Sequence, residues 1–214
     1  APFECDSEIV ELDGNTFAVS CDSVRAEDGI WGDDARLNGR NTAIAVLSDL
    51  LAAGAQPQFM LGCATFVEGT EPSEANLFAQ GIREVLEGCS ATFAGGDVDF
   101  GEASSFSGFA IGKCSANGPV SRLCPVDEGL LFVSGEIGSA NAGYVLADHC
   151  PRLYLRLEHS RGLNPAFCSF MDTSDGLAIA VRTLARLNGG IRLTLEHERI
   201  PFSSSVRRAA QQTG

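Results

Sequence analysis

Several aspartates stand where a loop could present a carboxylate to a ligand. Asp22 follows a short β-like run, Asp97 ends the motif Ala-Gly-Gly-Asp at residues 94–97, and residues 171–177 read Met-Asp-Thr-Ser-Asp-Gly-Leu. Mg²⁺ prefers hard oxygen ligands and usually binds a few carboxylates together with substrate phosphates. Dispersed aspartates that converge in the fold would therefore suit the chemistry of ATP.

A further aspartate, Asp49, lies inside an amphipathic helix that the apolar spacing predicts over residues 37–53. Aspartate is a poor helix former, and a charge on the buried side of a helix is costly. We therefore expect a cation or hydrogen-bond donors to meet Asp49. Glycines beside the other aspartates allow backbone amides to approach a phosphate closely.

Each motif taken alone also has an ordinary structural interpretation. A Gly-Gly-Asp sequence is more often a plain turn, and Ser-Asp before an apolar run is commonly a helix cap. Residues 172–176 superficially suggest a calcium loop, but the EF-hand order of ligands and its later glutamate are not met. Only the positions of the aspartates in the fold can decide between these alternatives.

The established signatures of other sites are missing. The sequence contains no Walker A motif, no Gly-x-Gly-x-x-Gly after a strand, no Gly-x-Ser-x-Gly and no Cys-x-x-Cys pair. The absence of paired cysteines argues against a zinc site. His149, His159 and His197 lie far apart in the sequence, and we expect them to be surface or structural residues.

Composition excludes some partners. Lys and Arg number 15 against 28 Asp and Glu, which gives a formal charge of −13 and would repel a phosphate backbone, so we expect no nucleic-acid partner. No 18-residue apolar run crosses the chain and no signal peptide opens it, so we expect a cytoplasmic protein without a membrane partner. The eight cysteines are then free thiols, with a disulfide framework as the alternative.

Strand-like and helix-like patterns alternate along the chain and predict an α/β or α+β fold. A hairpin is predicted around Asp13-Gly14, and helices, strands and a glycine turn at residues 95–96 follow up to Pro125. The pattern then restarts. We expect one domain over residues 1–125 and a second over 126–214, the second with strands at 130–134 and 191–195 and helices at 140–147 and 176–187.

Taken together and in order, these motifs resemble thiamine-monophosphate kinase, a family related to aminoimidazole ribonucleotide synthetase, selenophosphate synthetase and the hydrogenase-maturation dehydratase. The family has an Asp-Asp pair near its first strand, a Leu-Ser-Asp-Leu-Ala-Ala-Met-Gly-Ala helix, a Gly-Gly-Asp turn and an Asp-Ile-Ser-Asp-Gly-Leu segment. The counterparts here are Asp6, residues 47–55 (LSDLLAAGA), residues 95–97 and residues 172–177 (DTSDGL). Residues 127–143 also resemble the start of the family's second domain.

The resemblance implies a mixed-sheet N-terminal domain that forms a homodimer through its strands, with ATP and Mg²⁺ at that interface, and a C-terminal α/β domain over the site. If the roles of the family's aspartates apply to the matching positions here, the Mg²⁺ ligands would be Asp6, Asp22, Asp49, Asp97, Asp172 and Asp175. Asp97, Asp172 and Asp175 would also be the catalytic residues, and the nucleotide would contact Gly95, Gly96, Ser174 and Gly176. The implied reaction is direct, in-line phosphoryl transfer to a small phosphorylated metabolite, first of all thiamine monophosphate.

Four departures from the family pattern leave alternatives open. Cys5 replaces the first Asp of the Asp-Asp pair, residues 29–31 replace Gly-Val-His-Phe, the usual Arg after Asp97 is missing, and so is a later Gly-Gly-Glu-Asp-Tyr-Glu segment. We therefore expect an incomplete C-terminal domain. Another activity of the superfamily remains an alternative, as does a subunit that keeps the fold and the dimer without catalysis.

Overall fold

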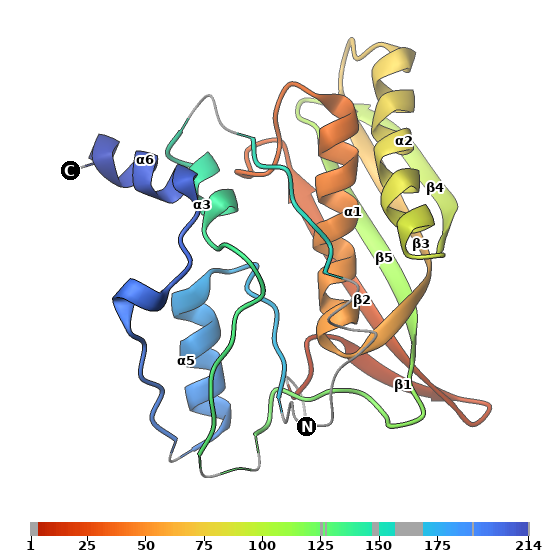
Figure 1. Ribbon diagram of the computed structural model, residues 1–214. Coiled ribbons are helices and arrows are strands. Elements are labelled where there is room, and N and C mark those ends of the chain that lie inside the picture. Colours follow the sequence, from red (N-terminus) through yellow and green to blue (C-terminus); the bar gives the residue numbers. More distant parts are fainter. Residues whose placement is uncertain are drawn as a thin grey trace.

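The computed structural model describes residues 4–124, 126, 128–146, 150–156, 169–189 and 191–213. Its N-terminal part is a five-stranded sheet covered by two long helices, and its C-terminal part consists of shorter helices joined by extended segments (Figure 1). The predicted α/β class is confirmed.

The sheet has the strand order β1-β2-β5-β3-β4. Its strands are β1 (Glu8–Leu12), β2 (Asn15–Arg25), β3 (Ala55–Val67), β4 (Thr92–Gly101) and β5 (Ser105–Cys114). All neighbours are antiparallel except β3 and β4, which are parallel because a helix connects them. The predicted hairpin is β1–β2, and Asp13 and Gly14 both take positive φ angles in its turn.

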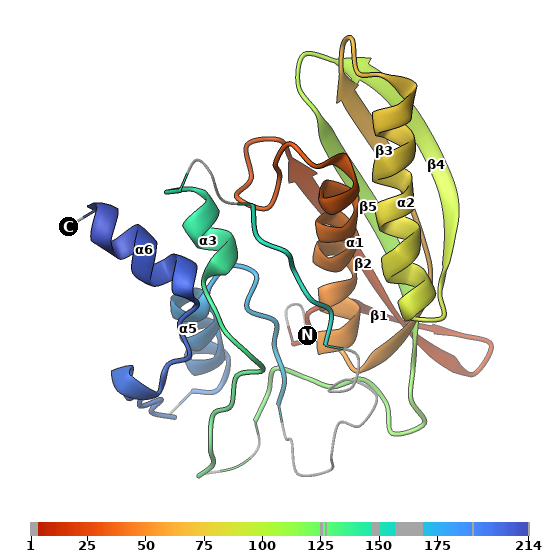
Figure 2. The ribbon, with the colours of Figure 1, turned by 45° about the horizontal axis from the view of Figure 1, so that its top comes forward.

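Two helices, α1 (Ala35–Ala52) and α2 (Pro72–Gly88), lie side by side on one face of the sheet (Figures 1 and 2). Alternate residues of each strand face these helices, and Met60, Phe66 and Phe106 are buried there. Phe78 of α2 packs against Phe66 and Phe106 with ring centroids 5.6 Å apart. The helices come very close at Gly39, since a Cβ there would lie 2.0 Å from the carbonyl oxygen of Phe78.

Residues 95–96 do not form the predicted turn but lie inside β4, at a bulge made by Ala94 and Gly95. Phe93 pairs with Met60 and Gly96 pairs with Gly62, so two residues of β4 oppose the single residue between Met60 and Gly62 on β3. Gly96 has φ 152°, and a Cβ at this position would lie 1.7 Å from the Gly62 carbonyl oxygen. Glycines with positive φ occur in β-bulges as well as in turns, so the two glycines in the sequence could not distinguish a bulge from a turn.

The C-terminal part contains α3 (Ser139–Gly143), α5 (Leu177–Leu187), a short 3₁₀ helix η1 (His197–Arg199) and α6 (Ser204–Thr213). It lies on the α1 side of the N-terminal part, away from α2 and β4 (Figure 2). Helix α3 packs against α6 through the buried residues Ala142, Leu146 and Ala209. The helix predicted at 176–187 is confirmed as α5, and the one predicted at 140–147 is present as α3 but ends at Gly143. The strands predicted at 130–134 and 191–195 are wrong, because in the described residues no strand pairs with either segment.

Some predictions fall outside the described residues, namely the domain boundary at Pro125, His149, His159 and the thiol of Cys168. The other seven cysteines form no disulfide with one another. Among the described residues, no helix is both long and apolar enough to cross a membrane.

Candidate functional site

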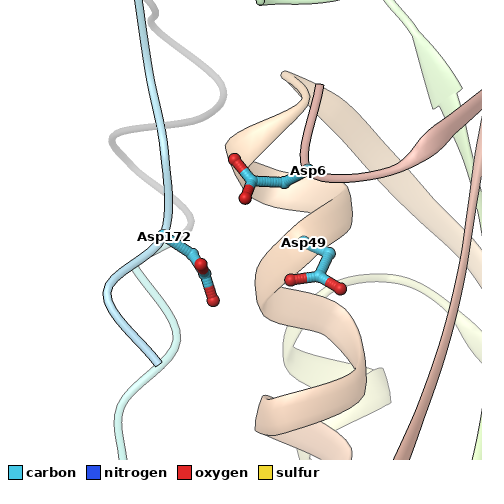
Figure 3. A group of neighbouring side chains, drawn as sticks. All are labelled: Asp6, Asp49 and Asp172. Atoms are coloured by element: carbon cyan, nitrogen blue, oxygen red, sulfur yellow. The ribbon is translucent and has the colours of Figure 1, made fainter. Parts of the chain in front are cut away.

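Three aspartate side chains from distant parts of the sequence meet beside α1. Asp6 precedes β1, Asp49 lies in α1, and Asp172 lies in the segment before α5. One carboxylate oxygen from each lies within 4.8 Å of the other two, and the three side chains point into the space between their segments (Figure 3). We call this group the aspartate cluster.

Asp49 is held in the cluster by the packing of α1 on β2. The Ser20 hydroxyl of β2 donates a hydrogen bond of 2.7 Å to Asp49 Oδ2. Burial raises the pKa of Asp49 to about 7; the hydrogen bond from Ser20 opposes this rise, and the charges of Asp172 and Asp6 add to it. The expectation that Asp49 meets a hydrogen-bond donor is confirmed.

Asp6 has a cationic partner that the sequence analysis did not find. Arg122 Nε donates to Asp6 Oδ1 at 3.0 Å, and its Nη2 donates to the same oxygen. Only 1% of the Asp6 side chain is exposed, and burial raises its pKa although the Arg122 guanidinium lowers it. Asp6 Oδ2 is buried and has no hydrogen-bond partner among the described residues.

Asp172 receives a long hydrogen bond of 3.4 Å from the Ser48 hydroxyl, which lies next to Asp49 in α1. Asp22 of β2 pairs with Gly108 of β5 and lies on the same face of the sheet as Ser20. Partial desolvation raises the pKa of Asp22, and so do the charges of Asp172 and, more weakly, Asp28 and Asp175. Asp22 and Asp175 are therefore electrostatic neighbours of the cluster without being members of it.

Asp97 lies elsewhere in the folded chain. It pairs with Cys63 of β3, and Cys63 pairs with Ser107 of β5, a row of residues on the face of the sheet opposite the helices. Gly96, which pairs with Gly62, and Gly95 of the bulge come directly before it. In a single chain, the Gly-Gly-Asp motif at residues 95–97 therefore lies on the other side of the sheet from Asp49.

The motif before α5 forms a turn that is closed by a hydrogen bond of 2.9 Å from the amide of Gly176 to the carbonyl of Thr173. Gly176 occupies the N-cap position of α5 with φ 90°, a conformation that favours glycine. Ser174 and Asp175 are exposed in this turn. Both are accessible to a ligand that reaches Asp172.

The donor set of the aspartate cluster fits Mg²⁺. Three hard carboxylate oxygens converge, and Asp6 also has a buried oxygen, Oδ2, that has no hydrogen-bond partner in the described part of the chain. Buried polar atoms in proteins are nearly always partnered, so an oxygen without a partner among the described residues is available to an ion. Burial is the main cause of the raised pKa of Asp49, and the charges of Asp172 and Asp6 add to it; a bound cation would offset these charges.

A family model described as AIR synthase related protein, N-terminal domain, matches residues 5–114, which include the whole sheet and both covering helices. The chain belongs to this family. The resemblance found in the aspartate motifs is thereby confirmed at the level of the superfamily.

Curated relatives of this AIR synthase family member include two thiamine-monophosphate kinases. The protein of Corynebacterium glutamicum is 26% identical over 195 residues, which cover 82% of this chain and 58% of the relative. The protein of Archaeoglobus fulgidus is 24% identical over 205 residues, which cover 90% of this chain and 67% of the relative. The chain thus spans about three fifths to two thirds of the length of these relatives.

Solved structures share the fold. AaThiL complexed with AMPPCP and TMP has a TM-score of 0.85 at 20% identity, covering 100% of this chain and 74% of that chain. Thiamine monophosphate kinase from Aquifex aeolicus gives 0.82 at 20% identity, covering 98% and 75%. The hydrogenase maturation protein HypE of E. coli gives 0.80 at 16% identity, covering 99% and 72%. The fold is therefore common to proteins with different names.

Proposed function

We propose that this chain belongs to an ATP- and Mg²⁺-dependent enzyme of thiamine biosynthesis that phosphorylates a small phosphorylated metabolite. Thiamine monophosphate is the first candidate acceptor, and thiamine diphosphate would be the product. The observation that carries the proposal is the convergence of three carboxylates in the aspartate cluster. The names of the relatives in Corynebacterium glutamicum and Archaeoglobus fulgidus support the acceptor.

In this proposal Asp6, Asp49 and Asp172 hold the ion, and bound Mg²⁺ supplies charge neutralisation for the phosphates of ATP. The hydroxyl of Ser20 orients the carboxylate of Asp49, and Ser48 makes only a long contact with Asp172 because its hydroxyl also donates to the carbonyl of Ala45 at 2.8 Å. Asp22 and Asp175 add negative charge around the ion, and Ser174 and Gly176 stand where they could contact the nucleotide. Catalysis would consist of positioning and electrostatic stabilisation, with no covalent enzyme intermediate.

A subunit that keeps the fold without catalysis is the second candidate. It is favoured by Arg122, which already neutralises one of the three carboxylates, and by Cys5 in place of a family aspartate. In such a subunit the guanidinium would take the place of the metal ion. The two candidates differ in whether Mg²⁺ and nucleotide bind.

Calorimetry with a non-hydrolysable ATP analogue tests the proposal on the full-length native protein. We expect about one nucleotide to bind per chain with Mg²⁺ present and binding to be lost without it. Thiamine monophosphate and related acceptors would then be assayed with ATP. An absence of binding at millimolar nucleotide would refute the enzyme and leave the structural subunit.

The proposal includes a homodimer formed through the open face of the sheet. This face carries large exposed apolar side chains, since Phe59, Leu61 and Phe109 are 39%, 41% and 47% exposed. Leu61 and Phe109 are direct partners across β3 and β5, so the apolar surface is continuous. Exposed apolar patches of this kind mark interaction surfaces. Asp97 lies on this face, and it would contribute to the nucleotide site from the interface.

Substituting Phe109→Asp is expected to convert the dimer to a monomer, because a charge at the centre of the interface would lose its hydration. The measurement is molar mass by light scattering at micromolar protein. Leu77→Asp on α2 is the matched control, since Leu77 is 41% exposed but lies on a helix instead of the open face. A native protein that is monomeric, or a dimer that survives Phe109→Asp, would exclude this interface.

A further inference from the structure

Three arginines line a cavity of about 350 Å³ near the start of α1, away from the aspartate cluster. Arg36 lies 13 residues before Asp49 in α1, which corresponds to roughly 20 Å along the helix axis. The lining residues are Asp34, Arg36, Leu37, Arg40, Glu84 and Arg152. Three guanidinium groups therefore share this cavity with two carboxylates, in a chain whose formal charge is −13.

The two carboxylates are already engaged. Glu84 bridges two arginines, accepting from Arg36 Nε at 2.5 Å and from Arg40 Nη1 at 3.0 Å. Asp34 caps α1, since its Oδ1 accepts from the amides of Arg36 and Leu37 at 2.9 and 3.0 Å. The helix amides are thus already satisfied, and the available donors are the arginine side chains. Arg40 Nε is buried and has no acceptor among the described residues.

Arg152 is brought to the cavity by a buried asparagine. Asn41 of α1 is fully buried, and its Nδ2 donates to the carbonyl of Pro151 at 2.8 Å. Its Oδ1 accepts from the amide of Leu153 at 3.0 Å. The residues on both sides of Arg152 are therefore fixed to α1, and in the described part of the chain Arg152 has no carboxylate partner.

We propose that this cavity binds a small molecule through its phosphate group. Three guanidinium groups and two carboxylates line the cavity, which leaves an excess of positive charge that an anion would offset. A phosphate group offers several oxygens in the geometry that the arginine fork matches, so it can serve more than one arginine at once. The volume lies within the range of small-molecule sites. The site is separate from the proposed nucleotide site.

Calorimetric titration of inorganic phosphate into the full-length protein, stripped of divalent metal on a chelating resin, tests the proposal. Without metal the aspartate cluster repels phosphate, so binding there does not contribute. We expect one phosphate per chain with millimolar affinity. Arg152→Gln should weaken this binding about tenfold or more, because a charge-assisted hydrogen bond is lost. Arg152 is exposed, so the variant should fold normally.

Arg83→Gln is the matched control, because Arg83 is exposed on α2 next to Glu84 but does not line the cavity. It removes the same charge and should leave phosphate binding unchanged. A second variant, Arg40→Gln, should also weaken binding. The proposal is overturned if phosphate does not bind at millimolar concentration, if Arg152→Gln binds it as well as the native protein does, or if acetate binds as tightly as phosphate.

Discussion

Replacing Asp49 with asparagine is expected to abolish Mg²⁺-dependent nucleotide binding and, at the same time, to stabilise the metal-free protein at pH 8. Asparagine keeps a side-chain oxygen that can accept the hydrogen bond of Ser20 but removes one of three anionic oxygens that converge in the cluster. Mg²⁺ binds through carboxylates, so we expect its affinity to fall at least a hundredfold, by about 3 kcal/mol. Calorimetry with Mg²⁺ and the ATP analogue measures this loss.

The stability change follows from the pKa of Asp49, which burial raises from its ordinary value of 3.8 to about 7 in the folded protein. Because the folded pKa is the higher one, the folded protein binds more protons than the unfolded chain between these two values. Stability therefore falls as pH rises from about 4 to about 7 and stays lower above that. The asparagine side chain does not titrate, so Asp49→Asn should gain about 2 kcal/mol over the native protein at pH 8 and almost nothing at pH 4.

Urea denaturation at pH 4 and pH 8 without Mg²⁺ measures this effect. Glu68→Gln removes one charge from an exposed turn and should alter neither the nucleotide affinity nor the pH dependence. An Asp49→Asn variant that still binds nucleotide with Mg²⁺ would show that Asp49 is not a ligand. If the variant and the native protein differ in stability by the same amount at pH 4 and pH 8, the Asp49 carboxylate is not destabilised by its burial.

The elements of the N-terminal sheet could be predicted because each carries its own local pattern. Residues 57–66 alternate between a buried and an exposed face, and residues 37–53 and 73–87 repeat apolar side chains at helical spacing. The strands predicted at 130–134 and 191–195 failed because apolar, β-branched composition describes a segment that can pair, while a strand exists only where a partner is present. The described residues supply no such partner.

The site was only partly predictable for a related reason. Asp49 could be singled out locally, as a costly charge on a helix, but its meeting with Asp6 and Asp172 depends on how three segments pack. Arg122 gave no signal, since it pairs with a carboxylate 116 positions away. Asp97 ends the Gly-Gly-Asp motif of the family that the sequence resembles, yet the sheet register puts it on the opposite face from α1. Spacing along the sequence reveals neither the pairing of Arg122 with Asp6 nor the face of the sheet on which Asp97 lies.

Substituting Arg122→Met is expected to destabilise the metal-free protein by about 3 kcal/mol at pH 8, because it leaves a buried carboxylate without its counter-charge. The Asp6 side chain is 1% exposed, and Arg122 donates to its Oδ1 from two nitrogens. The loss should shrink as the pH falls, since protonation of Asp6 removes the charge. Urea denaturation of the native protein and the variant between pH 4 and pH 8 measures the difference in their free energies of unfolding.

Added Mg²⁺ should stabilise Arg122→Met more than it stabilises the native protein. At the proposed site of the native protein the ion would share Asp6 with a guanidinium, and the two positive charges would repel each other. In the variant the ion alone would compensate the carboxylates. A ligand of the folded state adds stability that increases with its affinity, so the tighter site gives the larger gain. Arg83→Met, at an exposed position of α2, is the control and should respond to Mg²⁺ as the native protein does. A smaller gain in Arg122→Met than in the native protein would mean that Arg122 holds Asp6 in place for the ion instead of competing with it.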